Sequence, residues 1–135
     1  MPIATRIALI YLVLTGVAVG AWAYGFPDGF YRAFPGIGRS WVSMDGPYNQ
    51  HLVQDAGAAY LMMAALSGLG LARPAIATPA AVGFATLVFN GLHLAYHTTH
   101  LGMFGMADRA LNVVALGSAV VASAWLMTPQ ARVHR

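Results

Sequence analysis

The side chains best suited to chemistry in this sequence are three histidines within the segment GLHLAYHTTHLG, residues 91–102. His93, His97 and His100 are separated by four and three positions. A helix turns by about 100° per residue, so this spacing predicts that all three rings share one narrow face. Imidazole titrates near neutral pH and is the commonest metal-binding side chain. Three interpretations are open: a structural hydrogen-bonded network, a metal or haem site, and a site of proton transfer or quinone-level acid/base chemistry.

Polar residues elsewhere in the chain are spaced so that they can join these histidines. Thr86 and Asn90 fall on the same predicted helical face as His93. This polar stripe should face the interior of a bundle, because lipid cannot satisfy its hydrogen-bonding groups. Two other segments carry polar pairs at the i, i+4 spacing of one helical face, namely His51 with Asp55 and Asp108 with Asn112. The order of the predicted helices brings all of these groups to one side of the membrane.

These residues define a candidate metal site. Its predicted ligands are His51, Asp55, His93 and His97, with His100 as the alternate. The chain has no cysteine, which excludes thiolate zinc sites and iron–sulfur clusters. Imidazole-rich ligation suits copper or zinc and disfavours magnesium and calcium. Iron and haem rank lower, since a bundle this small would need its interior cleared to hold a haem, and a site without any metal is also an open alternative.

The composition predicts that lipid is the solvent for most of the chain. Of the 135 residues, 59% are hydrophobic and 8% are charged. A bilayer core about 30 Å thick needs roughly 20 apolar residues per helix. We therefore predict an all-α polytopic membrane protein, a single domain over residues 1–135 that forms a four-helix transmembrane bundle. The predicted spans cover about residues 5–26, 51–72, 79–101 and 108–127.

Local signals mark the ends of these spans. Pro79 is a good first-turn residue, Gly102 can end the third helix, and Asp108 is the predicted N-cap of the fourth. Gly16 and Gly20, four residues apart, favour close helix packing in the first span. The first segment also has features of a secretory signal peptide, an arginine before an apolar run and a small-x-small triplet. We interpret it as a retained first helix.

The loop after the first span is rich in aromatic residues and in proline and glycine, which break long helices. Its aromatic side chains are predicted to lie at the membrane surface as part of an aromatic belt. They are Phe30, Tyr31, Phe34 and Trp41.

The charge distribution bears on orientation and on partners. The net charge of +3 comes from arginines that are scattered singly along the chain. Because they form no basic stripe, nucleic acid is not an expected partner. Arginines on the side of the termini slightly outnumber those on the other side, which predicts an integral cell-membrane protein with both termini in the cytoplasm. The two groups are Arg6, Arg73, Arg132 and Arg135 against Arg32, Arg39 and Arg109.

Sequence motifs for catalysis are absent. The chain has no HExxH motif, no glycine-rich loop with a lysine, and no nucleophile elbow. The spacing of His93, His97 and His100 is similar to the histidine boxes of membrane di-iron desaturases and hydroxylases, but those enzymes use more histidines than the five present here. A self-contained enzyme is therefore not expected.

Three segments together carry a family resemblance. An early apolar helix, FYRAFPGIGRSWVSMDGPYNQHLVQDAGAAYL and LHLAYHTTH resemble small bacterial four-helix membrane proteins related to the DoxX-like superfamily. The resemblance covers nearly the whole chain. It implies a four-helix architecture and no particular mechanism.

Small size and short loops favour a role as an accessory subunit of a larger membrane assembly, such as an oxidoreductase or a monooxygenase. The expected partners are the lipid bilayer and either other membrane subunits or further copies of this chain. The alternative is an independent metal-binding or redox membrane protein that uses the histidine and aspartate residues of the candidate metal site.

Overall fold

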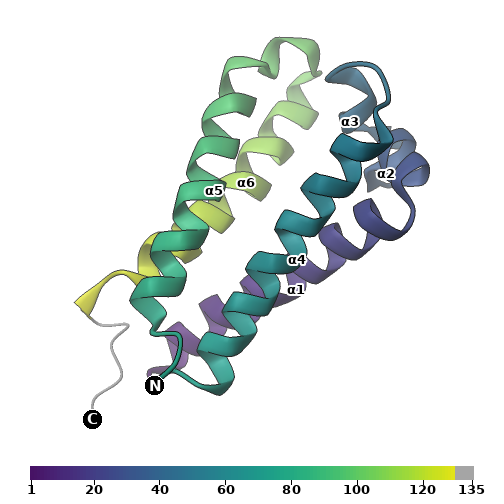
Figure 1. The fold of residues 1–135 in the computed structure, drawn as a ribbon. Helices are drawn as coiled ribbons and strands as arrows, with labels where there is room; N and C mark the ends of the chain where they lie inside the picture. The colour runs from purple at the N-terminus through teal and green to yellow at the C-terminus, as the bar shows by residue number, and fades with distance from the viewer. Residues whose placement is uncertain (130–135) are drawn as a thin grey trace. The chain divides into compact units, whose positions relative to one another are not determined.

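The computed structural model describes residues 1–129 and is mostly helical. Its four long helices are α1 (Ile3–Gly25), α4 (Gln50–Ala72), α5 (Pro79–Thr99) and α6 (Met106–Leu126) (Figure 1). Every end lies within two residues of the predicted spans. The prediction of a mostly helical chain is confirmed for the described residues, whereas the four-helix transmembrane bundle stays a prediction.

Three of the long helices are long and apolar enough to cross a membrane. Mean hydropathy over the best 18-residue window is 2.0 in α1, 1.3 in α4 and 1.5 in α6. Helix α5 is not among them. Its sequence contains Thr86, Asn90, His93 and His97, which lower its hydropathy.

The segment between α1 and α4 contains more regular structure than predicted. It holds α2 (Pro27–Ala33), the strands β1 (Pro35–Gly36) and β2 (Arg39–Ser40), which pair antiparallel, and α3 (Trp41–Met44). Phe30 and Trp41 are buried, and Phe34 lies against both, with ring centroids 4.6 Å from Phe30 and 6.1 Å from Trp41. Phe30 packs into a local core with Ala23 and Val53. That these rings lie at the membrane surface as part of an aromatic belt stays a prediction.

The turn between β1 and β2 places a β-branched residue in the left-handed region. Ile37 has a φ of 53° and the following Gly38 a φ of 73°. A two-residue hairpin turn of this kind suits asparagine or glycine at its first position, because a left-handed conformation costs an ordinary residue about 1–2 kcal/mol. The Ile37 side chain is 87% exposed and gains little packing in return.

Ile37→Asn should therefore stabilise the protein by about 1 kcal/mol, since asparagine tolerates the left-handed region. The free energy of unfolding, measured in mixed micelles, provides the test. Ile37→Val is the matched control and should leave stability unchanged, because valine keeps the branched Cβ. An Ile37→Asn protein less stable than the parent would contradict the assignment of strain to this turn.

The chain divides into two compact units, and the boundaries fall inside α1 and α4. Unit 2 spans Leu14–Ala64, and unit 1 comprises Met1–Val13 and the chain from Ala65 onward. The prediction of a single domain stays a prediction.

In unit 2, the second half of α1 packs closely on the first half of α4. A Cβ added to Gly20 would lie 2.8 Å from the Gly57 carbonyl oxygen, and one added to Gly16 would lie 2.9 Å from the Tyr60 carbonyl oxygen. The backbones therefore approach too closely for any larger side chain. This confirms the packing role predicted for Gly16 and Gly20.

In unit 1, α5 and α6 lie side by side and antiparallel (Figure 1). A Cβ added to Gly83 on α5 would lie 2.7 Å from the Leu126 Cβ and 2.7 Å from the Ser123 carbonyl oxygen on α6. Leu9, Val82 and Leu126 are fully buried and form the centre of an apolar cluster. The α5–α6 pair is thus tightly packed.

Candidate functional site

Helix α5 begins as predicted and carries a polar stripe on its buried face. The Thr78 hydroxyl oxygen accepts a hydrogen bond from the Ala81 amide at 3.2 Å, and Pro79 occupies the first turn. Further along, the Thr86 hydroxyl donates to the Val82 carbonyl at 2.9 Å, and the Asn90 amide nitrogen donates to the Ser123 hydroxyl on α6 at 3.2 Å.

Thr86 is fully buried and Asn90 is 6% exposed. The prediction that this part of the stripe faces the interior is confirmed.

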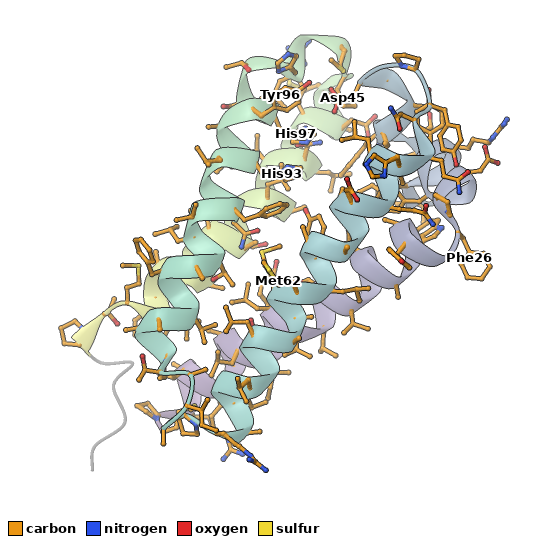
Figure 2. All side chains as sticks on the ribbon, in the orientation of Figure 1. Phe26, Asp45, Met62, His93, Tyr96 and His97 are labelled. Atoms are coloured by element: carbon orange, nitrogen blue, oxygen red, sulfur yellow. The ribbon has the colours of Figure 1, made fainter. Side chains whose placement is uncertain are left out.

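His93 and His97 continue the stripe on successive turns of α5 (Figure 2). Their ring centroids are 4.6 Å apart and their planes are inclined by 72°. The His93 ring stacks on Phe89 at 5.4 Å, while Tyr96 meets His97 edge-on at 5.5 Å. Both histidines are partly buried. The two imidazoles are therefore held as a close pair by aromatic neighbours.

His100 leaves the face predicted for it. Helix α5 ends at Thr99, and His100 is the C-cap with φ −113° and ψ 9°. Its Nδ1 lies 2.8 Å from the Tyr96 carbonyl oxygen, and its ring stacks on Tyr96 with centroids 4.1 Å apart. Because a carbonyl only accepts hydrogen bonds, Nδ1 carries the proton in this contact. His100 helps to end the helix.

The position of this helix end differs from the prediction for a local reason. The Thr98 and Thr99 hydroxyls donate to the Ala95 and Tyr96 carbonyls at 2.8 and 2.7 Å. Such side-chain bonds compete with continuation of the helix. The chain then forms a short 3-10 turn, η1 (Leu101–Met103), so Gly102 lies beyond the helix end that it was predicted to cause.

His51 and Asp55 form the predicted pair at the start of α4. The His51 Nε2 lies 3.2 Å from the Asp55 carboxylate, and both side chains are exposed. The Asn49 side-chain oxygen accepts from the Leu52 amide at 3.1 Å and caps this helix end. An exposed pair of this kind contributes little stability.

The five predicted ligands fall into separate groups. His51 and Asp55 belong to unit 2, whereas His93, His97 and His100 belong to unit 1. Within residues 1–129, no three histidine, aspartate or glutamate side chains are gathered in a way that could hold a metal ion. The combined site stays a prediction, and the group closest to one is the His93–His97 pair.

Helix α6 begins earlier than predicted, which changes the role of Asp108. The N-cap is Gly105, whose extended backbone precedes Met106. Asp108 is the third residue of the helix, where a carboxylate interacts favourably with the helix dipole. The prediction of Asp108 as N-cap is wrong because η1 brings the chain into the helix two residues sooner.

Asn112, one turn further along α6, is deeply buried. Its side chain is 3% exposed, and within residues 1–129 its Oδ1 has no hydrogen-bond partner. The Ser67 hydroxyl on α4 is also fully buried and has no hydrogen-bond partner within residues 1–129. Nothing in the spacing of Ser67 distinguishes it from an ordinary packing residue, so the sequence could not have identified it.

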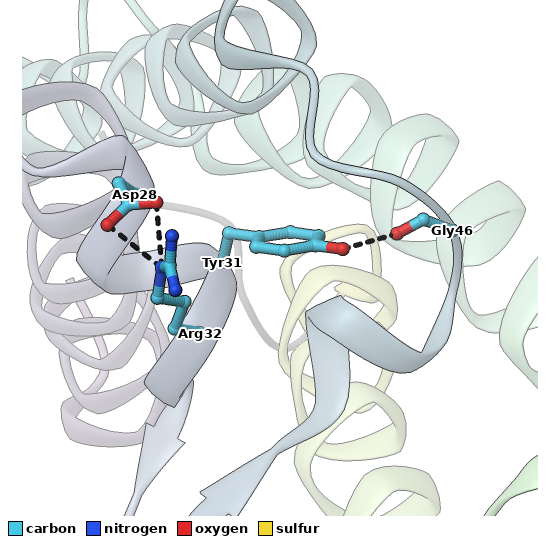
Figure 3. A network of polar contacts seen from close by, with 4 residues as sticks. All are labelled: Asp28, Tyr31, Arg32 and Gly46. Atoms are coloured by element: carbon cyan, nitrogen blue, oxygen red, sulfur yellow. Dashed lines mark hydrogen bonds and ion pairs between the residues drawn. The ribbon is translucent and has the colours of Figure 1, made fainter.

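A second polar network lies in unit 2, near the surface (Figure 3). The Arg32 Nε donates to both carboxylate oxygens of Asp28, at 2.8 and 3.0 Å. This hydrogen bond and the Asp28 charge raise the pKa of Arg32. The Tyr31 hydroxyl donates to the Gly46 carbonyl at 2.7 Å. The Tyr31 hydrogen bond joins α2 to the segment after α3, whereas the Arg32–Asp28 pair lies within α2.

An apolar groove of about 620 Å³ lies between α1 and α6 within unit 1. Ile7, Ala8, Val121 and Trp125 are among the residues that line it. Its polar feature is a hydrogen bond of 2.5 Å between the Tyr11 and Ser118 hydroxyls. The mid-helix position of Tyr11 was the only sequence signal for this contact.

Comparison of the chain with protein-family models, with curated proteins and with solved structures finds no match. The resemblance to the DoxX-like superfamily therefore stays a prediction.

Proposed function

We propose that this chain is a small integral membrane protein that functions as a subunit of a larger membrane assembly and contributes an imidazole site from α5. Both termini lie in the cytoplasm in this proposal, as the arginine distribution favours; Arg132 and Arg135 lie outside the described residues. The apolarity of α1, α4 and α6 supports membrane insertion.

Helix α5 is the fourth crossing in this proposal. Its 21 residues reach about 31 Å at 1.5 Å per residue, which matches the bilayer core. The residues that lower its hydropathy include Thr86 and Asn90, and both are buried. Its outward side presents Phe84, Val88 and Leu92, each at least half exposed. Lipid would therefore meet an apolar surface.

The glycines of the long helices support the proposal of partner subunits. A Cβ added to Gly16, Gly20, Gly57, Gly70 or Gly83 would lie less than 3.0 Å from a neighbouring atom. Gly91 on α5 and Gly117 on α6 differ, since an added Cβ would meet nothing within 4 Å. Glycine costs a helix about 1 kcal/mol relative to alanine. Packing within the described chain gives no reason for these two glycines.

Gly91 and Gly117 lie at nearly one level of the α5–α6 pair. Gly91 is eight residues beyond Gly83, and Gly117 is nine residues before Leu126, which contacts Gly83. By helical periodicity, Gly91 lies about 100° from Asn90 and Gly117 about 140° from Asn112, so both turn away from the α5–α6 interface. A helix of another subunit could approach either backbone closely.

Enlarging these glycines tests the proposal. Gly91→Leu and Gly117→Leu should each release the partner chains that accompany the protein in gentle detergent, while the helical content stays unchanged. Ala85→Leu is the matched control, because it adds a similar bulk at another exposed position of α5. If both glycine variants retain the partner chains, the proposal that a partner subunit contacts Gly91 and Gly117 is wrong.

A second candidate function is metal or redox chemistry, and the geometry of the His93–His97 pair favours it. Two imidazoles at the i, i+4 spacing with centroids 4.6 Å apart can direct two nitrogens at one transition-metal ion. Copper or zinc suits such ligands better than iron.

Elemental analysis and metal titration test this candidate. The purified protein should hold close to one equivalent of copper or zinc, and a combined His93→Ala, His97→Ala variant should lose at least about 100-fold in affinity, since two ligands are removed. His100→Ala is the control and should bind as the parent does, because His100 caps the helix. Less than about a tenth of an equivalent in the parent protein would rule this candidate out.

A further inference from the structure

The apolar groove of unit 1 has the same pattern of residues in both of its walls. One wall takes positions i, i+3, i+4 and i+7 of α1 from Ala4 onward, and the other takes the same positions of α6 from Ser118. Such positions form one face of a helix, and both helices are apolar enough to cross a membrane. The volume of about 620 Å³ lies in the range of small-molecule sites. The groove is therefore a continuous apolar channel between two membrane helices.

The groove runs lengthwise between the two helices and has an inner and an outer end. At the inner end, the Tyr11 and Ser118 hydroxyls are hydrogen-bonded at 2.5 Å and connect α1 to α6. Ala4 lies seven residues before Tyr11, and Trp125 lies seven residues after Ser118. At 1.5 Å per residue, the groove is about 10 Å long. It opens at the end of unit 1 where α1 begins and α6 ends (Figure 1).

The end of unit 1 at which the groove opens is positively charged. Arg6 on α1 and Arg73 after α4 are both exposed. They lie at the same end, because a Cβ added to Gly70 near the end of α4 would lie 3.5 Å from the Leu9 side chain on α1. By sequence, Asp108 is the only acidic residue of unit 1, and it lies in the first turn of α6, at the opposite end of that helix. Arginines near a membrane surface attract anionic lipid headgroups.

We propose that this groove binds one acyl chain of an anionic phospholipid, whose phosphate headgroup lies at the end of unit 1 that carries Arg6 and Arg73. A flexible acyl chain can enter a groove that ends at the Tyr11–Ser118 hydrogen bond. A partner helix that crosses the membrane is about three times longer than the groove, since the bilayer core is about 30 Å thick. The inference rests on the membrane insertion proposed above and is independent of the partner subunits.

Photo-crosslinking with a labelled lipid tests the inference. The purified protein is reconstituted in phosphatidylcholine vesicles that contain a trace of phosphatidylglycerol with a diazirine in one acyl chain, and the labelled residues are mapped by mass spectrometry. We expect labelling to be concentrated at residues 4–11 and 118–125. The same diazirine on phosphatidylcholine should label these residues at least about fivefold less, because one arginine near the surface is worth about that factor for an anionic lipid.

Two variants with matched controls test the groove and its charge separately. Ala4→Phe fills the outer end of the groove and should lower the labelling of residues 118–125 about tenfold, since the loss of two buried methylene groups has an effect of this size. Ala124→Phe adds the same bulk at an exposed position of α6 outside the groove and should change nothing. Arg6→Gln should lower the preference for phosphatidylglycerol about fivefold, whereas Arg32→Gln in unit 2 should leave it unchanged.

The outcomes separate this inference from the membrane insertion on which it rests. Even labelling of all exposed faces of α1 and α6, or groove labelling that Ala4→Phe leaves unaltered, would overturn the lipid site while membrane insertion stands. Equal labelling by the two lipids would contradict the anionic headgroup. If neither helix is labelled, membrane insertion is wrong and the inference fails with it. Copurified partner chains that are released by Ala4→Phe, with labelling unchanged, would assign the groove to a partner subunit and overturn the lipid site.

Discussion

Gly83→Leu should lower the free energy of unfolding by about 3 kcal/mol or more, because the new side chain cannot be accommodated between α5 and α6. A Cβ at this position would lie 2.7 Å from the Ser123 carbonyl oxygen, which is backbone and cannot rotate away. The helices would have to separate, and the Asn90–Ser123 hydrogen bond would be lost with them. Unfolding by a denaturing detergent, followed by circular dichroism, measures the effect.

Gly117→Leu is the control for this experiment. It makes the same change on the other helix of the pair, at a position where an added Cβ meets nothing within 4 Å. We expect the isolated chain to keep its stability within about 0.5 kcal/mol or to gain slightly, since glycine is a poor helix former. Equal losses in the two variants would contradict the α5–α6 packing described above.

Asn90→Asp should destabilise the protein by about 3 kcal/mol, because a carboxylate near the middle of a membrane helix costs about 2.5–3.5 kcal/mol. Asn90 is 6% exposed and donates to the Ser123 hydroxyl. That hydroxyl already donates its own proton to the Ala119 carbonyl at 2.8 Å. An aspartate would therefore face an oxygen with no proton to offer. The same unfolding measurement reports the loss.

Thr86→Val, one turn before Asn90, is the control. It distinguishes the cost of a carboxylate at position 90 from the cost of any change in the polar stripe. The Thr86 hydroxyl bonds to carbonyls of its own helix, and valine has nearly the same shape. Its loss should cost less than about 1 kcal/mol. An Asn90→Asp protein as stable as the Thr86→Val protein would show that Asn90 is not in a buried, dry environment.

The interior-facing part of α5 was predictable because it depends on helical periodicity alone. Thr86 and Asn90 recur at the spacing of one face, and lipid leaves such a face no alternative to burial. The lengths of the four long helices were predictable from the sequence, and the apolarity of α1, α4 and α6 agrees with the prediction of membrane spans. The spacing of Gly16 and Gly20 likewise predicted a close helix approach.

The departures from prediction arise where side chains bond to the backbone or where contacts distant in sequence decide. His100 leaves the predicted face because Thr98, Thr99 and His100 itself satisfy carbonyls at the end of α5. Asp108 is displaced from the N-cap because η1 shortens the connection. The contacts of Phe30 and Trp41 with Phe34 were not part of the prediction, because aromatic content alone does not reveal which rings pack together.

We propose that the chain is a subunit of a larger membrane assembly. The most direct test is to extract it from its native membrane in a gentle detergent and to measure the mass and composition of the intact particle. The proposal predicts a particle that contains other membrane chains in fixed stoichiometry with this one. A homogeneous monomer or homodimer of this chain alone would contradict it.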